Sequence, residues 1–172
     1  MVATNSLAQR STRELQAYGA ACLAAFALAK GIRHAGIREL VEHLLGALQA
    51  EDLGRWDSQG AALPLSGRGD ELPKEIASIP DVAQLVDCVV EIGLIDLYAG
   101  DTGAPASFAG EAIDILRRNG IQAPSAEEIF GEGRTSKPGW GPPHDAAIFE
   151  RAHRWCLLHL DETRSNGVPA TR

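Results

Sequence analysis

Apolar residues recur three or four positions apart along most of the chain, and no stretch alternates cleanly between apolar and polar positions. The first spacing is typical of amphipathic helices, whereas clean alternation is typical of strands. The sequence therefore predicts an all-α, single-domain protein, an irregular bundle of about six helices around a central apolar helix. The predicted helices cover 11–30, 36–50, 80–100, 106–119, 125–130 and 145–160.

The segment from Val82 to Tyr98 is apolar on most of its sides and includes Val89 and Ile92. A helix that lacks a polar face is normally buried on all sides in a folded protein. We therefore expect this helix to be the central one of the bundle.

Several residues mark where the helices begin and end. Ser11 and Glu14 fit a capping box, in which the first side chain accepts a hydrogen bond from a helix amide and the second binds back to the first residue. Asp81 and Gln84 fit the same motif. Gly120 follows the fourth predicted helix and indicates a left-handed stop. The other expected caps are Gly31, Ser125 and Asp145.

Residues 51–79 differ from the rest of the chain because glycine and proline punctuate them. Short helical turns are expected at 52–56 and 75–79, with a long irregular connection between them. Loops of this length are uncommon inside compact domains and are often functional. We expect residues 1–165 to form one helical domain and 166–172 to form a flexible tail.

The chain carries 16 basic and 23 acidic residues, which gives a formal charge of −7 at pH 7. Nucleic-acid phosphates and anionic lipid headgroups repel such a chain unless basic residues gather in one patch, and the sequence has none. We therefore expect no nucleic-acid partner and no membrane partner. The acidic balance favours a basic protein partner.

Two features bear on the compartment. The three cysteines are widely spaced and odd in number, which favours a reducing environment over a disulfide framework. Arg10 and Arg13 precede an apolar run over 17–29, as in a signal peptide, but Glu14 and Gln16 argue against that interpretation. The run is also shorter than the about 20 residues that span a bilayer. The expected location is the cytoplasm.

Three potential metal ligands, His153, Cys156 and His159, are spaced three apart on the last predicted helix. Imidazoles and a thiolate are good zinc ligands, but the sequence indicates no fourth ligand. Cys156 also belongs to the apolar stripe of its helix. We therefore expect no metal site and no cofactor.

Acidic residues on the 80–100 helix are the main candidates for chemistry. Asp87 and Glu91 lie four positions apart, and Asp96 follows. Paired carboxylates can perform acid–base work, bind a partner or form ion pairs. Glu91 lies between Val90 and Ile92, so if it is buried it must be paired or protonated. The arginines available for such pairs are Arg38, Arg117 and Arg118.

Two glycine-containing segments are candidate binding loops. The 131–144 loop matches no phosphate-binding motif, and its Trp140 either seals the loop onto the core or stacks on a ligand. Arg68-Gly69-Asp70 matches a cell-adhesion tripeptide, but Asp70 is better explained as a turn residue or a helix cap.

Four short segments carry a resemblance to a known group of proteins: Gly67-Arg68-Gly69-Asp70-Glu71-Leu72-Pro73, Glu91-Ile92-Gly93, Leu97-Tyr98 and Gly139-Trp140-Gly141. With the order of the helices, they make the chain similar to small all-helical bacterial proteins of unassigned function, some of which are proposed toxin-immunity proteins. The resemblance implies a small acidic binder in the cytoplasm and supplies no catalytic residues.

The leading hypothesis is a non-enzymatic acidic binding protein, and an immunity protein that covers a basic bacterial toxin is its specific form. Glu39, Asp87, Glu91 and Trp140 are the expected partner-binding residues. One alternative is a small helical enzyme or ligand-binding domain that uses Glu91 and the 131–144 loop. Another is a homo-oligomeric scaffold such as a homodimer.

Overall fold

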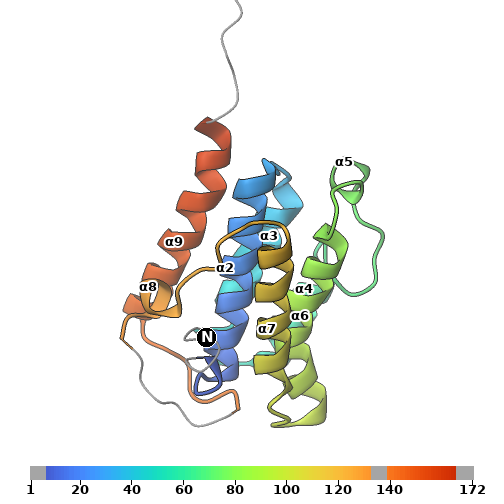
Figure 1. Ribbon diagram of the computed structural model, residues 1–172. Coiled ribbons are helices and arrows are strands. Elements are labelled where there is room, and N and C mark those ends of the chain that lie inside the picture. The colour runs from blue at the N-terminus through green and yellow to red at the C-terminus, as the bar shows by residue number, and fades with distance from the viewer. Residues whose placement is uncertain (1–6, 133–138, 166–172) are drawn as a thin grey trace, which may run out of the picture.

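The computed structural model describes residues 7–132 and 139–165, with side chains described as far as Glu162, and this part contains eight α-helices and no strand. Figure 1 shows the longer helices side by side in one bundle, which confirms the predicted all-α fold. The helices are α2 (Thr12–Lys30), α3 (Ala35–Gly46), α4 (Leu53–Ala61), α5 (Lys74–Ala77), α6 (Val82–Ala99), α7 (Ala104–Arg118), α8 (Ala126–Phe130) and α9 (Ala146–Ser165).

The central helix is α2, and the expectation that Val82 to Tyr98 would hold this place is wrong. Helices α3, α6, α7 and α9 all pack against α2, and its residues are buried without interruption from Thr12 to Ala27. α6 is more apolar, but Gln84 and Asp87 leave it an exposed side. The alanine-rich surface of α2 explains the difference, because small side chains let several helices approach one axis. Val89 and Ile92 are fully buried as predicted.

Glycine sets the spacing where α2 and α6 cross. A Cβ atom on Gly19 would lie 2.7 Å from Cδ1 of Ile92 and 3.3 Å from Cβ of Val89. On α6, a Cβ atom on Gly93 would clash with Oε1 of Gln16 and lie 3.1 Å from the ring of Trp140. The two helices could not pack this closely if either glycine carried a side chain.

The predicted helix ends are confirmed at most positions. Both hydrogen bonds of the Ser11–Glu14 capping box are present, and Gly31 ends α2 in the left-handed conformation. After α7, the amide of Ile121 donates to the carbonyl of Leu116 over 2.9 Å, as a left-handed stop requires. Ser125 accepts from the amide of Glu128, and Asp145 accepts from the amide of Ile148.

The second predicted capping box is not formed. Asp81 has a φ of 65° and its side chain makes no cap. Its carboxylate instead accepts hydrogen bonds from Arg118 over 2.7 Å and from Asn119 over 2.7 Å, at the end of α7. The carboxylate of Asp81 therefore pairs with a residue of α7 instead of capping α6 as the motif predicts.

Three boundaries differ from the predicted ones by more than two residues. α3 ends at Gly46 rather than at residue 50, and α9 continues to Ser165 rather than ending at residue 160. The turn expected at 52–56 is the nine-residue α4, which shortens the irregular connection. The predicted flexible tail, 166–172, lies outside the described residues. None of the described helices combines the length and the apolar character needed to cross a bilayer.

Candidate functional site

A buried arginine joins the end of α3 to the 139–144 segment. The guanidinium of Arg13 donates to the carbonyls of Ala47 over 2.6 Å, Ala50 over 2.8 Å and Gly141 over 3.0 Å. Burial lowers the pKa of this guanidinium. Because the last carbonyls of a helix lack partners within it, Arg13 supplies the missing donors at the end of α3. It thereby fixes the turn from α3 to α4.

Trp140 closes the same region from the other side. Its ring meets Trp56 edge-on at 5.7 Å between centroids, and the guanidinium of Arg13 lies 5.8 Å from its centre. The ring is half-buried beside Gly93, and its Nε1 has no hydrogen-bond partner in the described part of the chain. These contacts agree with the interpretation of Trp140 as a seal of its loop. Its role as a partner contact stays a prediction.

A hollow of about 570 Å³ lies on the outer side of α3. We call it the α3 groove, and its wall includes Glu42 and His43 of α3, Glu51, Asp52 and Arg55 at the start of α4, and Phe149 of α9. The imidazole of His43 stacks on Trp56 at 4.9 Å with an interplanar angle of 9°, and Nε1 of Trp56 donates to the carbonyl of His43 over 2.9 Å. This stack attaches α4 to α3.

The groove is acidic at neutral pH. Burial lowers the pKa of His43 to about 4, and the nearby charge of Arg68 lowers it further than Asp57 raises it. His43 is therefore uncharged near pH 7 and offsets none of the three carboxylates. Glu42 is partly neutralised by Arg38 at 3.3 Å, and Arg55 is the one cationic side chain among the groove's lining residues.

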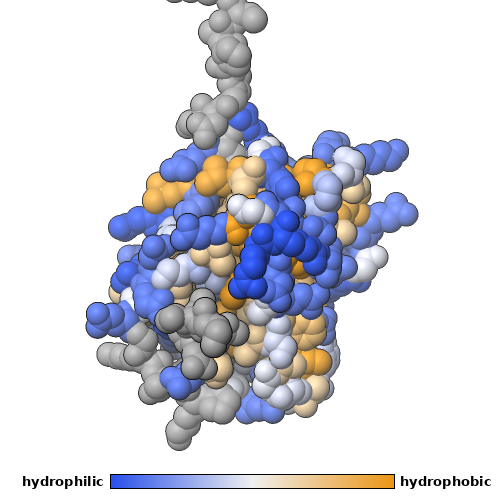
Figure 2. Space-filling view, in the orientation of Figure 1, coloured by the Kyte–Doolittle hydropathy of each residue, from blue (hydrophilic) through white to orange (hydrophobic). Residues whose placement is uncertain are grey.

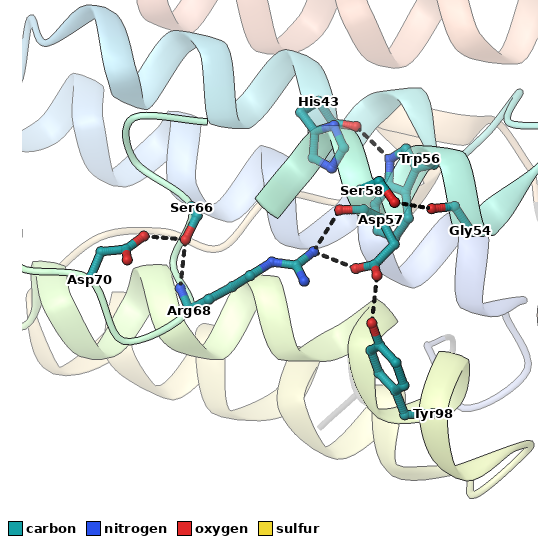
Figure 3. Close-up of polar contacts among 9 residues, drawn as sticks. All are labelled: His43, Gly54, Trp56, Asp57, Ser58, Ser66, Arg68, Asp70 and Tyr98. Carbon is teal, nitrogen blue, oxygen red and sulfur yellow. Dashed lines mark hydrogen bonds and ion pairs between the residues drawn. The ribbon is translucent and has the colours of Figure 1, made fainter. Parts of the chain in front are cut away.

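A second polar cluster, which we call the Asp57 clip, begins at the residue after Trp56 on α4 and is shown in Figure 3. Asp57 of α4 is buried and accepts two hydrogen bonds of 2.5 Å, one from Nη2 of Arg68 and one from the hydroxyl of Tyr98. Burial raises the pKa of Asp57, but the bonds from Tyr98 and Arg68 outweigh it and leave this pKa lowered. The clip joins α4, the 62–73 connection and the end of α6.

The adhesion-like tripeptide is part of this clip. Arg68 is bound to Asp57, and Asp70 accepts a hydrogen bond from Ser66, whose oxygen also accepts from the amide of Arg68. Figure 3 shows this turn beside the extended Arg68 side chain. Asp70 therefore helps to hold the irregular segment before α5 and does not cap that helix, and the guanidinium of Arg68 is bound to Asp57 within the chain.

The acidic residues predicted to bind a partner lie on different helices in the structure. Glu39 is exposed on α3 and lies one turn before Glu42 and His43, so it extends the acidic side of the α3 groove. Asp87 is exposed and Glu91 half-buried on α6, and neither lines the groove. The four predicted partner-binding residues therefore do not form one surface.

The proposed ion pairs of α6 are also corrected. Arg38 pairs with Glu42 and Asp161, Arg117 pairs with Asp114, and Arg118 pairs with Asp81. No residue in the described ranges pairs with Glu91. Asp96 forms no ion pair in the described ranges either; it is buried and accepts hydrogen bonds from Thr12 and Thr102.

The thiol and the two histidines of α9 all make packing contacts within the chain. Cys156 is fully buried, and burial raises the pKa of its thiol. His153 stacks on Phe149 at 5.4 Å, and His159 stacks on Trp155 at 3.7 Å. Over residues 7–132 and 139–162, no three His, Cys, Asp or Glu side chains are placed to share a metal ion.

Two features of this region escaped the sequence analysis. No motif marks Asp57, which directly follows the predicted helical turn at 52–56. The stack of His43 on Trp56 was missed because the sequence shows no spacing that would pair α3 with α4. Two segments that carried the resemblance, 67–73 and 97–98, supply Arg68 and Tyr98 to the Asp57 clip.

Comparisons with models of known protein families, with curated proteins and with solved structures found no match for this chain. The α3 groove and the Asp57 clip are therefore interpreted from their own chemistry. The clip holds elements of the fold together, whereas the groove is open to solvent and carries charge. The groove is the better candidate for a functional surface.

Proposed function

We propose that this chain is a non-enzymatic binding protein for a basic protein partner, and that the partner contacts the α3 groove. The observation that carries the proposal is the set of carboxylates that line an open hollow, namely Glu42 of α3 and Glu51 and Asp52 just before α4. Complementary charge speeds the encounter of two proteins and selects between partners. The charge of −7 on the whole chain acts in the same direction.

The protonation states around the groove support binding rather than catalysis. His43 is the only imidazole among its lining residues, and its pKa of about 4 makes it a weak base near pH 7. Asp57, Arg68 and Tyr98 are occupied with one another. The enzyme alternative that uses Glu91 remains a separate proposal, and the turnover of a small molecule that is lost in Glu91→Gln would support it.

The specific form of the proposal is a cytoplasmic immunity protein that covers a basic toxin. Its support is the resemblance noted in the sequence together with the acidic groove. An immunity protein that covers a toxin needs no catalytic residues. It needs a surface that is complementary to the toxin in shape and opposite in charge.

The test uses two double variants with equal changes in net charge. Glu39→Lys with Glu51→Lys reverses the charge of one residue that lines the α3 groove and of one beside it on α3, and Asp87→Lys with Glu91→Lys reverses two charges on α6. The tagged full-length chain and both variants are used to capture proteins from an extract of the native host, and association with the captured protein is then measured from low to high salt.

We expect a basic protein whose association with the unmodified chain slows as salt rises, since ions screen charges beyond about 8 Å at physiological strength. The groove variant should associate about tenfold more slowly, and the α6 variant should change only about twofold. A partner that is acidic, or an association rate that does not depend on salt, would contradict the proposal. A larger effect of the α6 variant would move the contact to Asp87 and Glu91.

A further inference from the structure

Asp81 is held in a backbone conformation that aspartate rarely adopts. Its φ is 65°, and in the described ranges no other residue except glycine has a positive φ. Glycine is the usual residue in this left-handed region, because a Cβ atom is strained there. The side chain of Asp81 does not cap α6, so capping does not explain why an aspartate stands at this position. The reason must lie in the contacts of its carboxylate with α7.

The carboxylate of Asp81 holds the side chain of Asn119 at the end of α7. Nδ2 of Asn119 donates to Oδ2 of Asp81 over 2.7 Å and to the carbonyl of Ile115 over 2.9 Å, so both hydrogens of this amide group are bound. The bonds from Arg118 and Asn119 lower the pKa of Asp81, which is therefore charged near pH 7. A hydrogen bond to a charged acceptor is stronger than one between neutral groups. Asp81 thus fixes the amide group of Asn119 firmly.

Asn119 is followed by glycine, and an asparagine before glycine is chemically labile. In deamidation the backbone nitrogen of Gly120 attacks Cγ of Asn119, the bond from Cγ to Nδ2 breaks, and ammonia leaves with the proton that the backbone nitrogen gives up. Water then opens the cyclic succinimide, so that position 119 becomes aspartate or isoaspartate. Glycine favours the attack because it has no side chain to hinder it and its backbone is the most mobile. Gly120 is exposed, and Figure 2 shows hydrophilic surface over the end of α7, so water reaches the site.

The folded geometry opposes this reaction at the attacking atom as well as at the amide group. The amide of Gly120 donates to the carbonyl of Arg117 over 3.0 Å, so its nitrogen is not free to attack. The ψ of Asn119 is 7°, which places the nitrogen of Gly120 on the side of the backbone nitrogen of Asn119 and away from its Cβ and Cγ. Ring closure requires a large rotation about this bond. The Asn119–Gly120 step can therefore react only after the end of α7 has opened.

We propose that Asn119–Gly120 is a deamidation site that Asp81 keeps closed, and that the reaction makes the opening of this contact between α6 and α7 permanent. A carboxylate at position 119 cannot donate to Asp81 and is repelled by its charge. It also adds negative charge at the C-terminal end of α7, where the helix dipole disfavours it. A chain that opens here and reacts cannot form the original contact again. The site is thus a one-way modification that records local opening.

The experiment follows the loss of the Asn119 amide by peptide mapping and mass spectrometry, with the full-length chain incubated in neutral buffer and in urea. Asn166–Gly167 has the same local chemistry and is the internal reference. Asp81→Gly removes the carboxylate without strain, because glycine suits a φ of 65°. Arg118→Gln is the matched control, since it removes the ion pair with Asp81 and leaves the acceptor of Asn119 in place. Circular dichroism confirms that both variants remain folded.

We expect Asn119 to lose its amide at least about tenfold more slowly in the folded chain than in urea, because the reaction requires local opening. Asp81→Gly should raise the rate in buffer at least about fivefold, and Arg118→Gln should change it no more than about twofold. The rate at Asn166 should be the same in all three proteins. Equal rates at Asn119 in buffer and in urea, or no increase in Asp81→Gly, would overturn the proposal. Equal increases in the two variants would also overturn it, because the ion pair and not the bond to Asn119 would then protect the site.

The permanence of the opening is tested with Asn119→Asp, which carries the side chain of one reaction product. We expect a lower urea midpoint than in the unmodified chain, and faster hydrogen exchange at the amides of Gly120 and Ile121, whose bonds end α7. An unchanged midpoint together with unchanged exchange would show that a carboxylate at this position is accommodated, and would contradict this part of the proposal.

Discussion

The hydroxyl of Thr12 donates a hydrogen bond of 2.8 Å to Oδ2 of Asp96, across 84 positions of the sequence. Both side chains are buried. The other oxygen of Asp96 accepts from the backbone amide of Thr102 over 3.0 Å and from its hydroxyl over 2.8 Å. One carboxylate therefore ties the first turn of α2 to the turn between α6 and α7.

Replacement of Asp96 by alanine is expected to lower the free energy of unfolding by about 3 kcal/mol, because it removes the acceptor of three donors, one of them the buried hydroxyl of Thr12. Urea denaturation measures the loss. The matched control is Asp87→Ala on the exposed side of the same helix, which should change the free energy by no more than about 0.5 kcal/mol. Equal losses in the two variants would show that the Asp96 bonds add nothing.

Two glycine-to-alanine changes should act in opposite directions. Gly93→Ala is expected to lower the free energy of unfolding by about 2 kcal/mol, because the added methyl group overlaps Oε1 of Gln16 and crowds Trp140. Gly110→Ala in α7 meets no atom within 4 Å and should raise it by about 0.5 to 1 kcal/mol through helix propensity. Thermal and urea unfolding compare the two. A stabilised Gly93→Ala variant would mean that α2 and α6 pack less tightly than described.

Acidification should destabilise the fold through His43 well before the carboxylates are protonated. The pKa of His43 is about 4 in the folded protein and near 6.5 when unfolded, so the unfolded chain binds more protons as the pH falls between these values. The stability that depends on the neutral imidazole is therefore lost over this window.

A His43→Gln variant should show a flatter dependence of the free energy of unfolding on pH between 6.5 and about 4. The other histidines, and the charged groups near His43, namely Asp57, Arg68 and Glu42, are the same in both proteins and cancel in the difference. Urea denaturation at a series of pH values gives both profiles. Parallel profiles would contradict the assignment of a lowered pKa to His43.

Tyr98→Phe tests the Asp57 clip. The change removes one of two hydrogen bonds of 2.5 Å to the carboxylate of Asp57 and should lower the free energy of unfolding at neutral pH. The pKa of Asp57 is lowered in the folded protein, so the stability linked to its ionised form is present above about pH 4 and is lost as the pH falls through the folded pKa. The difference in the free energy of unfolding between the variant and the unmodified chain should therefore become smaller at acidic pH. A difference that is constant with pH would mean that Tyr98 does not act through Asp57.

Local signals in the sequence predicted the local structure well. The Ser11–Glu14 capping box and the stop at Gly120 form as expected because each needs only residues of one turn. Asp81 did not follow its motif because Arg118, which lies far along the chain, binds its carboxylate. The central position of α2 could not be predicted from hydrophobicity either, since small alanine side chains, not the most apolar ones, permit four neighbouring helices.

The candidate site was predictable only in part. Glu39 lies beside the groove because it is four positions before His43 and therefore on the same side of α3. Such a relationship can be predicted from the spacing of residues along one helix. The Asp57 clip depends on Arg68 and Tyr98, 11 and 41 positions away, and on an α4 that continues beyond the predicted turn. A local sequence pattern cannot predict the Asp57 clip, because its contacts form only when three separate segments of the chain pack together.

The contact between α2 and α9 has a consequence for the order of folding during synthesis. α2 is among the first of the described helices to leave the ribosome and α9 is the last, yet α9 covers one side of α2. Until α9 emerges, the side of α2 that it covers lacks its native neighbour, and that side includes apolar surface of the kind that chaperones bind. The nascent chain therefore exposes part of its own centre until α9 arrives.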